Sequence, residues 1–181
     1  MKTYLRMIIA LGVLSLSFVP RSAHAQLPNG YGAAIGVETA RKVAAAAIAE
    51  GKKNGWTVAA AIVDTNGDLV FFERIDGTQV GSVTVSQEKA STAVRFKRPT
   101  KAFEDALVGG RQAILRLPGV VPIEGGIPLV IEGKIVGAIG VSGATSQQDG
   151  ICAQAGADTL GKAPAPPPPP KAPTPPPPTK K

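Results

Sequence analysis

The chain has 181 residues, with 20 Lys and Arg against 13 Asp and Glu, and this charge is unevenly distributed. Three basic residues fall in the first 25 positions and four in the last 20, so the 13 that remain balance all 13 acidic residues. A neutral central region lacks the clustered basic face that nucleic-acid binding requires. We therefore expect no nucleic-acid partner.

Residues 1–25 have the pattern of a secretory signal. Two basic residues precede an apolar run at 7–19, and Ala23-His24-Ala25 fits a small-x-small cleavage site. The run is too short to span a bilayer, and no later segment has the length of a transmembrane helix. We expect an exported protein, periplasmic or secreted, without a transmembrane segment.

Residues 26–161 form one predicted domain, which begins with a helix and a hairpin. An apolar stripe of helical period predicts a helix over 37–54. The apolar run at 57–63, rich in β-branched residues, predicts a strand covered on both faces. Asn66-Gly67 predicts a type I′ turn, so 69–75 is expected to be the antiparallel partner of that strand.

The rest of the domain continues with helices, a second hairpin and a last helix. These elements are a helix at 82–96, a short helix that Thr100 is expected to cap after Pro99, strands at 127–131 and 135–141, and a helix from a capping box at 146–149 to about 160. Two hairpins cannot be wound into a parallel sheet by crossovers. The order therefore predicts an α+β domain, with helices packed on an antiparallel sheet.

Residues 162–181 have a different composition from the domain. They contain 11 prolines in 20 positions, and Lys is their only charged residue. Such a segment cannot bury enough apolar surface to offset the entropy of ordering. We expect a disordered proline-rich tail that samples extended polyproline conformations.

Side chains that perform catalysis are scarce in the domain. The one His (His24) and both Met lie in the predicted signal, and Cys152 is the one cysteine. These facts exclude a Ser-His-Asp triad, a Cys-His pair, a His-based zinc site and His/Met haem ligation in the domain. The glycines at 137–143 lack the Lys-Ser/Thr ending of a phosphate-binding loop and fall within a predicted strand. No catalytic residue is indicated.

Three stretches resemble a known family. They are Ala61–Gly77, Glu88–Ala93 and Pro118–Gly150, the last with Glu124-Gly125-Gly126-Ile127-Pro128 followed by the glycine-rich 133–143 segment. Together they resemble the GlcG/HbpS-type haem-binding family, which also includes the C-terminal domain of PduO-type corrinoid adenosyltransferases. The resemblance runs from about Tyr31 to Leu160.

The resemblance implies a profilin-like fold, with a central antiparallel sheet flanked by helices, and a homo-oligomer between a dimer and an octamer. It also implies a non-enzymatic protein that binds haem or a related tetrapyrrole, in haem sensing, scavenging or iron handling. The chain lacks a Glu-x-x-Glu iron motif, and its nearest approach is Glu73-Arg74-Ile75-Asp76. This departure argues against iron storage.

The expected ligand contacts depend on which activity is considered. Haem needs an apolar surface with a few polar anchors, and Lys89, Arg95 and Lys97 are the expected partners of its propionates. The alternative activity is a small enzyme, or an enzyme-accessory protein, that acts on a small organic acid. In that case a pocket is expected at Glu124 and at the Gly125-Gly126 and Ser142-Gly143 turns.

Three side chains remain as alternative iron ligands. Thr100 follows an aromatic residue and two cations, and the resemblance implies a threonine ligand in an exported member. Tyr31 lies just before the first helix, where its ring could swing over a ligand. Cys152 is the strongest donor, but its small-residue helix face predicts an inert, buried thiol.

Overall fold

The computed structural model describes residues 29–161, so the predicted secretory signal and proline-rich tail lie outside the described residues. The elements are α1 (Val37–Lys53), β1 (Ala59–Val63), β2 (Leu69–Arg74), α2 (Ser82–Phe96), α3 (Lys101–Val108), β3 (Gly126–Ile131), β4 (Lys134–Ser142) and α4 (Ser146–Ala157). Short 3-10 helices follow α3 at Gln112–Arg116 (η1) and α4 at Asp158–Leu160 (η2).

The four strands form one antiparallel sheet in the order β2-β1-β4-β3. Each predicted hairpin is present, and the two hairpins join where β1 pairs with β4, with Ala61 opposite Gly140. Every residue of β1 is buried, as expected for a strand covered on both faces. The predicted α+β class is therefore confirmed.

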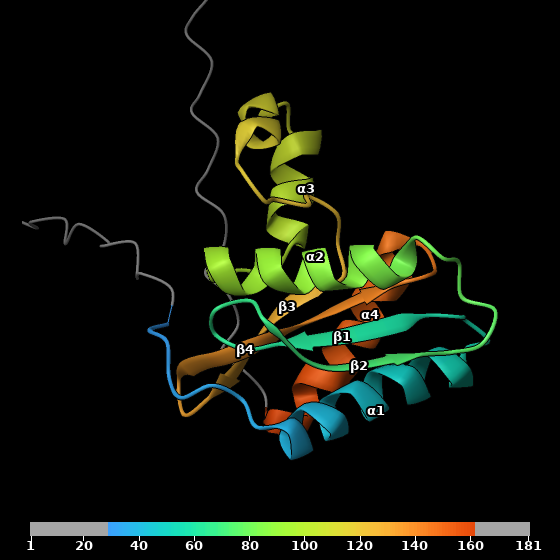
Figure 1. Ribbon diagram of the computed structural model, residues 1–181. Helices are drawn as coiled ribbons and strands as arrows, with labels where there is room; N and C mark the ends of the chain where they lie inside the picture. The colour runs from blue at the N-terminus through green and yellow to red at the C-terminus, as the bar shows by residue number, and fades with distance from the viewer. Residues whose placement is uncertain (1–28, 162–181) are drawn as a thin grey trace, which may run out of the picture.

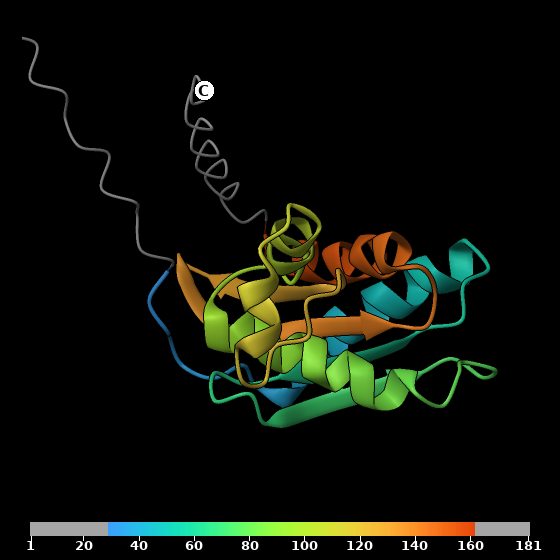
Figure 2. The same cartoon turned by 90° about the horizontal axis from the view of Figure 1, so that it is seen from above.

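The helices form layers on both sides of the sheet. Helices α1 and α4 lie on one face, and α2 crosses the other face over β1, β4 and β3 (Figures 1 and 2). Helix α3 and η1 stand away from the sheet on the α2 side (Figure 1). This arrangement leaves the outer side of α2 free to form a surface together with the loop that returns from η1.

Small residues allow α2 to lie close to the sheet. The buried cluster beneath this helix includes Ala90 and Ala93 of α2 and Ala138 of β4. A Cβ at Gly140 would collide with the backbone oxygen of Ser86, so β4 needs glycine where α2 crosses it. Gly140 therefore serves the packing of α2 on the sheet.

The turn between β1 and β2 differs from the type I′ prediction. A type I′ turn requires a positive φ at both central residues, but of the pair Asn66-Gly67 only Gly67 has one, at 93°. Instead, the Asp64 carboxylate accepts hydrogen bonds from the backbone N–H groups of Asn66, Gly67 and Asp68 at 2.8, 3.0 and 3.0 Å. An aspartate side chain therefore holds the loop.

Two predicted helix caps were also wrong in detail. The capping box of α4 is formed by Thr145 and Gln148, one residue earlier than predicted. Thr100 precedes α3, but its side chain makes no capping hydrogen bond. Its hydroxyl is used in a different contact, described below.

Candidate ligand-binding groove

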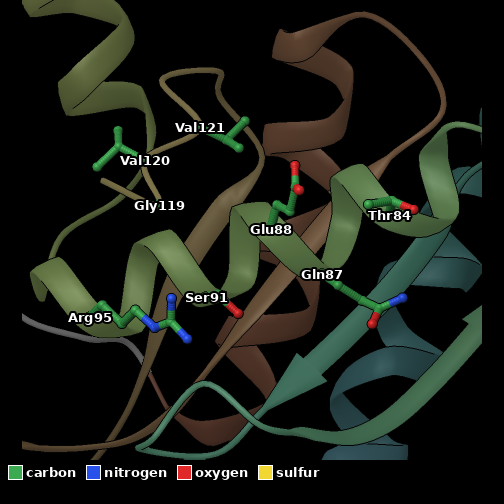
Figure 3. Close-up of a pocket in the computed structure, with 8 residues that line it drawn as sticks. All are labelled: Thr84, Gln87, Glu88, Ser91, Arg95, Gly119, Val120 and Val121. Atoms are coloured by element: carbon green, nitrogen blue, oxygen red, sulfur yellow. The ribbon is translucent and has the colours of Figure 1, made fainter. Parts of the chain in front are cut away.

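A groove of about 500 Å³ lies between the outer side of α2 and the loop at 119–121 (Figure 3). Its lining residues are Thr84, Gln87, Glu88, Ser91 and Arg95 from α2, and Gly119, Val120 and Val121 from the loop. Four of the helix residues are spaced four, three and four positions apart, which places them on one face of the helix. Hydroxyl and charged groups therefore face an apolar wall.

A buried threonine of α2 fixes the loop that forms this wall. The Thr92 hydroxyl donates a hydrogen bond to the Gly119 carbonyl at 3.2 Å and accepts one from the Val121 N–H at 3.0 Å. Thr92 has no exposed surface. The helix therefore supplies one wall of the groove and also anchors the other.

The groove contains one cation and one anion, neither of which is ion-paired within residues 29–161. The Arg95 guanidinium lies between two glycines, since a Cβ at Gly67 or Gly119 would be 3.2 or 3.5 Å from its nitrogens. Glu88 is exposed, and its carboxylate points toward the loop that carries Val121 (Figure 3). Both charges are available to a ligand.

Lys89, which was expected to contact a propionate, faces the protein interior. Its side chain is buried, and its Nζ donates hydrogen bonds to Asp149 Oδ2 at 2.8 Å and to the Val141 carbonyl at 3.1 Å. Burial raises the pKa of Asp149, and the neighbouring Lys89 ammonium opposes that shift. This position suits a structural ion pair and does not suit contact with a surface ligand.

The glycines of the Glu124-Gly125-Gly126 motif are also buried. A Cβ at Gly125, whose φ is 127°, would lie 2.9 Å from Lys89 Nζ and 2.6 Å from the Val141 carbonyl oxygen. A Cβ at Gly126 would collide with the backbone of Lys89. Both glycines therefore allow the chain to cover the ion pair, and neither lines the groove.

Two of the three expected iron ligands are buried. Thr100 exchanges two hydrogen bonds with Gly126: its N–H donates to the Gly126 carbonyl and its hydroxyl accepts from the Gly126 N–H, both at 2.9 Å. Cys152 has no exposed surface, and burial raises the pKa of its thiol to about 11. The expectation that this thiol is buried is confirmed, and neither residue can reach a ligand on the surface.

Tyr31 and Lys97 meet at the C-terminal end of α2. Tyr31 is 42% exposed, and its hydroxyl donates a hydrogen bond to the Val94 carbonyl at 2.9 Å. The Lys97 ammonium lies 4.3 Å from the centre of the Tyr31 ring, a cation–π contact. The pair lies beside the backbone of Arg95 but does not line the groove.

Glu124 belongs to a polar cluster that attaches α3 to the rest of the domain. Its carboxylate lies 3.7 Å from the Lys101 ammonium and against Gly150 of α4, and burial raises its pKa. The Glu104 carboxylate accepts hydrogen bonds from the Glu124 N–H and from the Ser146 hydroxyl. Within residues 29–161, no group of three or more His, Cys, Asp or Glu is placed to hold a metal ion.

The sequence reasoning missed most of the groove. It identified Arg95 but not Glu88, Ser91, Thr84 or the loop at 119–121. Glu88 and Arg95 are seven residues apart, two turns along one helix face, and this spacing could have linked them. The loop could not be placed beside them without the fold.

A family model described as "Haem degrading protein HbpS-like" matches residues 35–158, more than half of the chain. The chain belongs to the HbpS-like family. Protein GlcG of Escherichia coli K12 is 40% identical over 105 residues, which cover 58% of this chain and 78% of GlcG. A 15.0 kDa protein of Citrobacter freundii, from the dhaT-dhaS intergenic region, is 33% identical over 130 residues, covering 70% of this chain and 92% of that protein.

Solved structures of HbpS-like proteins have the same fold. The crystal structure of HbpS matches with a TM-score of 0.67 and 34% identity, covering 72% of this chain and 93% of that one. The crystal structure of a PduOC:haem complex matches with a TM-score of 0.64 and 25% identity, covering 71% of this chain and 96% of that one.

Among residues 29–161, every helix is too short or too polar to cross a membrane.

Proposed function

We propose that this protein binds haem, or a closely related tetrapyrrole, in the groove beside α2. The observation that carries the proposal is the pairing of an apolar wall, Val120 and Val121, with the cation of Arg95, which has no ion-pair partner within residues 29–161. A tetrapyrrole has a flat apolar ring and anionic propionates, so it needs contacts of both kinds. The lining supplies contacts of both kinds, but five of its eight residues are polar or charged, so the two valines would cover only an edge of the ring.

Family membership supports this proposal. The family description names haem degradation, and one related structure was solved as a haem complex. In this chain Arg95 would hold a propionate by a charge-assisted hydrogen bond, and the valines would cover the ring edge. Bound haem would supply a redox-active iron centre.

We propose further that the protein acts outside the cytoplasm as a homo-oligomer in haem sensing, scavenging or iron handling. The signal-like residues 1–25 support export, and intact mass of the protein from its native host tests cleavage after Ala25. Val108 and Leu115, 85% and 63% exposed on the α3–η1 arm, are available for contacts between subunits. Sedimentation equilibrium measures the subunit number.

The geometry does not favour the alternative activity on a small organic acid. That activity was expected to use a pocket at Glu124, Gly125 and Gly126, but both glycines are packed against protein atoms. Glu124 is engaged with Lys101. None of these three residues lines the groove beside α2.

Titration with haemin tests the proposal. We expect a shifted Soret band that saturates at stoichiometric haemin in the wild type. Arg95→Ala should weaken binding about tenfold, because a hydrogen bond to a charged group is lost. Arg41→Ala is the matched control, since Arg41 is an exposed arginine of α1 on the opposite face of the sheet, stacked on Phe71. A wild-type protein that leaves the haemin spectrum unchanged contradicts haem binding.

A further inference from the structure

The groove beside α2 has a polar side that haem would leave unused. Five of its eight lining residues are polar or charged. Glu88 is one of them: it is exposed and makes no ion pair within residues 29–161. The propionates of haem are anionic, so the edge of the ring offers no cation to this carboxylate. The lining therefore fits a second ligand of different chemistry.

The two charges of the groove have opposite signs and lie on one face of the helix. Glu88 and Arg95 are seven residues apart, which is two turns and about 10 Å along the axis of α2. The Glu88 carboxylate points toward the loop that carries Val121, and Arg95 lies further along the same helix (Figure 3). Arg95 also makes no ion pair within the described residues. A ligand that satisfies both side chains carries a cation and an anion about 10 Å apart.

Between these charges the groove offers a hydrogen-bond acceptor and a short apolar wall. The Ser91 hydroxyl donates its proton to the Gly67 carbonyl at 3.1 Å, so its oxygen remains as an acceptor. The side chains of Val120 and Val121 form the wall. The middle of the ligand should therefore supply an N–H group and a small apolar side chain, and a peptide backbone has both.

We propose that the groove binds a short peptide of about three residues, with its N-terminal ammonium at Glu88 and its C-terminal carboxylate at Arg95. An extended chain advances roughly 3.3 Å per residue, so a tripeptide spans about 10 Å between its termini. Each end is held by a charge-assisted hydrogen bond. The groove volume of about 500 Å³ lies within the range of small-molecule sites, roughly 300–1,000 Å³. This function goes beyond haem binding and does not depend on it.

Isothermal titration calorimetry of the full-length protein with trialanine tests the proposal. The titration is done at about pH 6.5, where the terminal ammonium is protonated. Trialanine should bind with one-to-one stoichiometry. N-acetyl-trialanine lacks the cation and trialanine amide lacks the anion, so each should bind about tenfold more weakly. Dialanine, which is too short to reach both charges, should also bind more weakly than trialanine.

Two variants assign each end of the peptide to its side chain. Glu88→Gln should bind trialanine and N-acetyl-trialanine with equal affinity, because the ammonium no longer has a partner. Arg95→Gln should bind trialanine and trialanine amide with equal affinity. Glu38→Gln and Arg41→Gln are the matched controls, because both residues are exposed on α1, on the opposite face of the sheet, and these variants should keep the wild-type preferences. Since Glu88 and Arg95 are also exposed, their variants should keep a thermal midpoint within a few degrees of the wild type.

The outcomes are independent of haem binding, because the peptide titrations contain no haem. If the wild type does not bind trialanine, or binds it without preference for its free termini, the proposal is wrong whatever haemin does. If Glu88→Gln or Arg95→Gln keeps the wild-type preferences, the peptide lies elsewhere and the assignment is overturned. Selective loss of each preference in its own variant supports the proposal even where haemin does not bind.

Discussion

Lys89→Met should destabilise the domain strongly without changing the proposed haem site. Met fills most of the space of the lysine side chain but removes the ammonium that donates to Asp149 and to the Val141 carbonyl. The Asp149 carboxylate is then buried with no cation beside it. Removing one partner of a buried ion pair costs roughly 3–5 kcal/mol of unfolding free energy.

The double variant Lys89→Met/Asp149→Asn separates the charge effect from the packing effect. Asparagine keeps the shape of Asp149 and an oxygen that can accept the hydrogen bond from the Ala144 N–H, at 3.0 Å in the wild type. The buried charge is gone, so we expect the double variant to regain about half of the free energy lost in Lys89→Met. An additive loss from the two changes would mean that the charges do not interact.

The effect of pH gives a second check with a defined sign. Burial raises the pKa of Asp149 above 3.8, and loss of Lys89 removes an effect that lowers it. A raised pKa in the folded state means that the folded protein holds this proton more tightly than the unfolded chain. The unfolding free energy of Lys89→Met should therefore be greatest at a pH below the pKa of Asp149 in the unfolded chain. It should fall as the pH rises through the raised pKa of Asp149 in the folded protein.

Urea denaturation followed by circular dichroism measures these changes. A loss of 3 kcal/mol should also lower the thermal midpoint by roughly 10 °C in a domain of this size. Haemin affinity, measured well below that midpoint, should remain within about twofold of the wild type, since Lys89 does not line the groove. A loss below about 1 kcal/mol would refute the structural role of the pair, and weakened haem binding by the folded variant would restore Lys89 as a propionate partner.

Three further predictions test the packing. Gly140→Ala should cost about 3 kcal/mol in urea denaturation because its Cβ collides with the backbone of α2, whereas Gly30→Ala, which meets no atom within 4 Å, should be nearly neutral. Cys152 should react with a maleimide only on unfolding, and fast labelling of the folded protein would contradict its burial. Burial raises the pKa of its thiol from 9.0 to about 11. The unfolding free energy of the wild type should therefore fall, relative to that of Cys152→Ala, as the pH rises from 9 to 11. Thr92→Val should lower the unfolding free energy by about 1–3 kcal/mol and weaken haemin binding, because it releases the loop at 119–121. Thr92→Ser keeps the hydroxyl and should retain wild-type stability and binding. Unchanged haemin affinity in Thr92→Val would show that the loop needs no anchor.

Local sequence pattern was sufficient for the fold because the strands and helices here follow simple periodicities. The helix predicted at 82–96 matches α2, and both hairpins were expected within two residues of their observed bounds. The errors lie at single hydrogen bonds. Thr145 with Gln148 fits the capping-box pattern S/T-x-x-E/Q, whereas Ser146 is followed by Asp149, so the correct cap of α4 could have been read from the sequence. At the first turn, Asp64 competes with Asn66-Gly67 for control of the loop.

The site was harder to predict because burial depends on contacts between distant segments. Lys89 and Asp149 are 60 residues apart, and only the packed fold brings them to 2.8 Å. One signal was available, since Lys89 lies between Ser86 and Ala93 on the stripe of α2 that faces the sheet. A lysine on such a stripe requires a buried partner, but the sequence does not indicate which carboxylate provides it.

Substitutions on the outer face of α2 should change ligand binding alone, whereas substitutions on its inner face should change both stability and binding. Outward-facing Glu88 and Arg95 have no partners in the described core, so their substitution should change ligand affinity at nearly constant stability. Ser86 lies where the backbones of α2 and β4 are in contact, and any added volume there must displace the whole helix. Because Thr92 connects α2 to the loop, that displacement would carry one wall of the groove with it. Substitutions on the inner face should therefore change both properties together, and a variant that loses haem affinity alone identifies an outer-face residue.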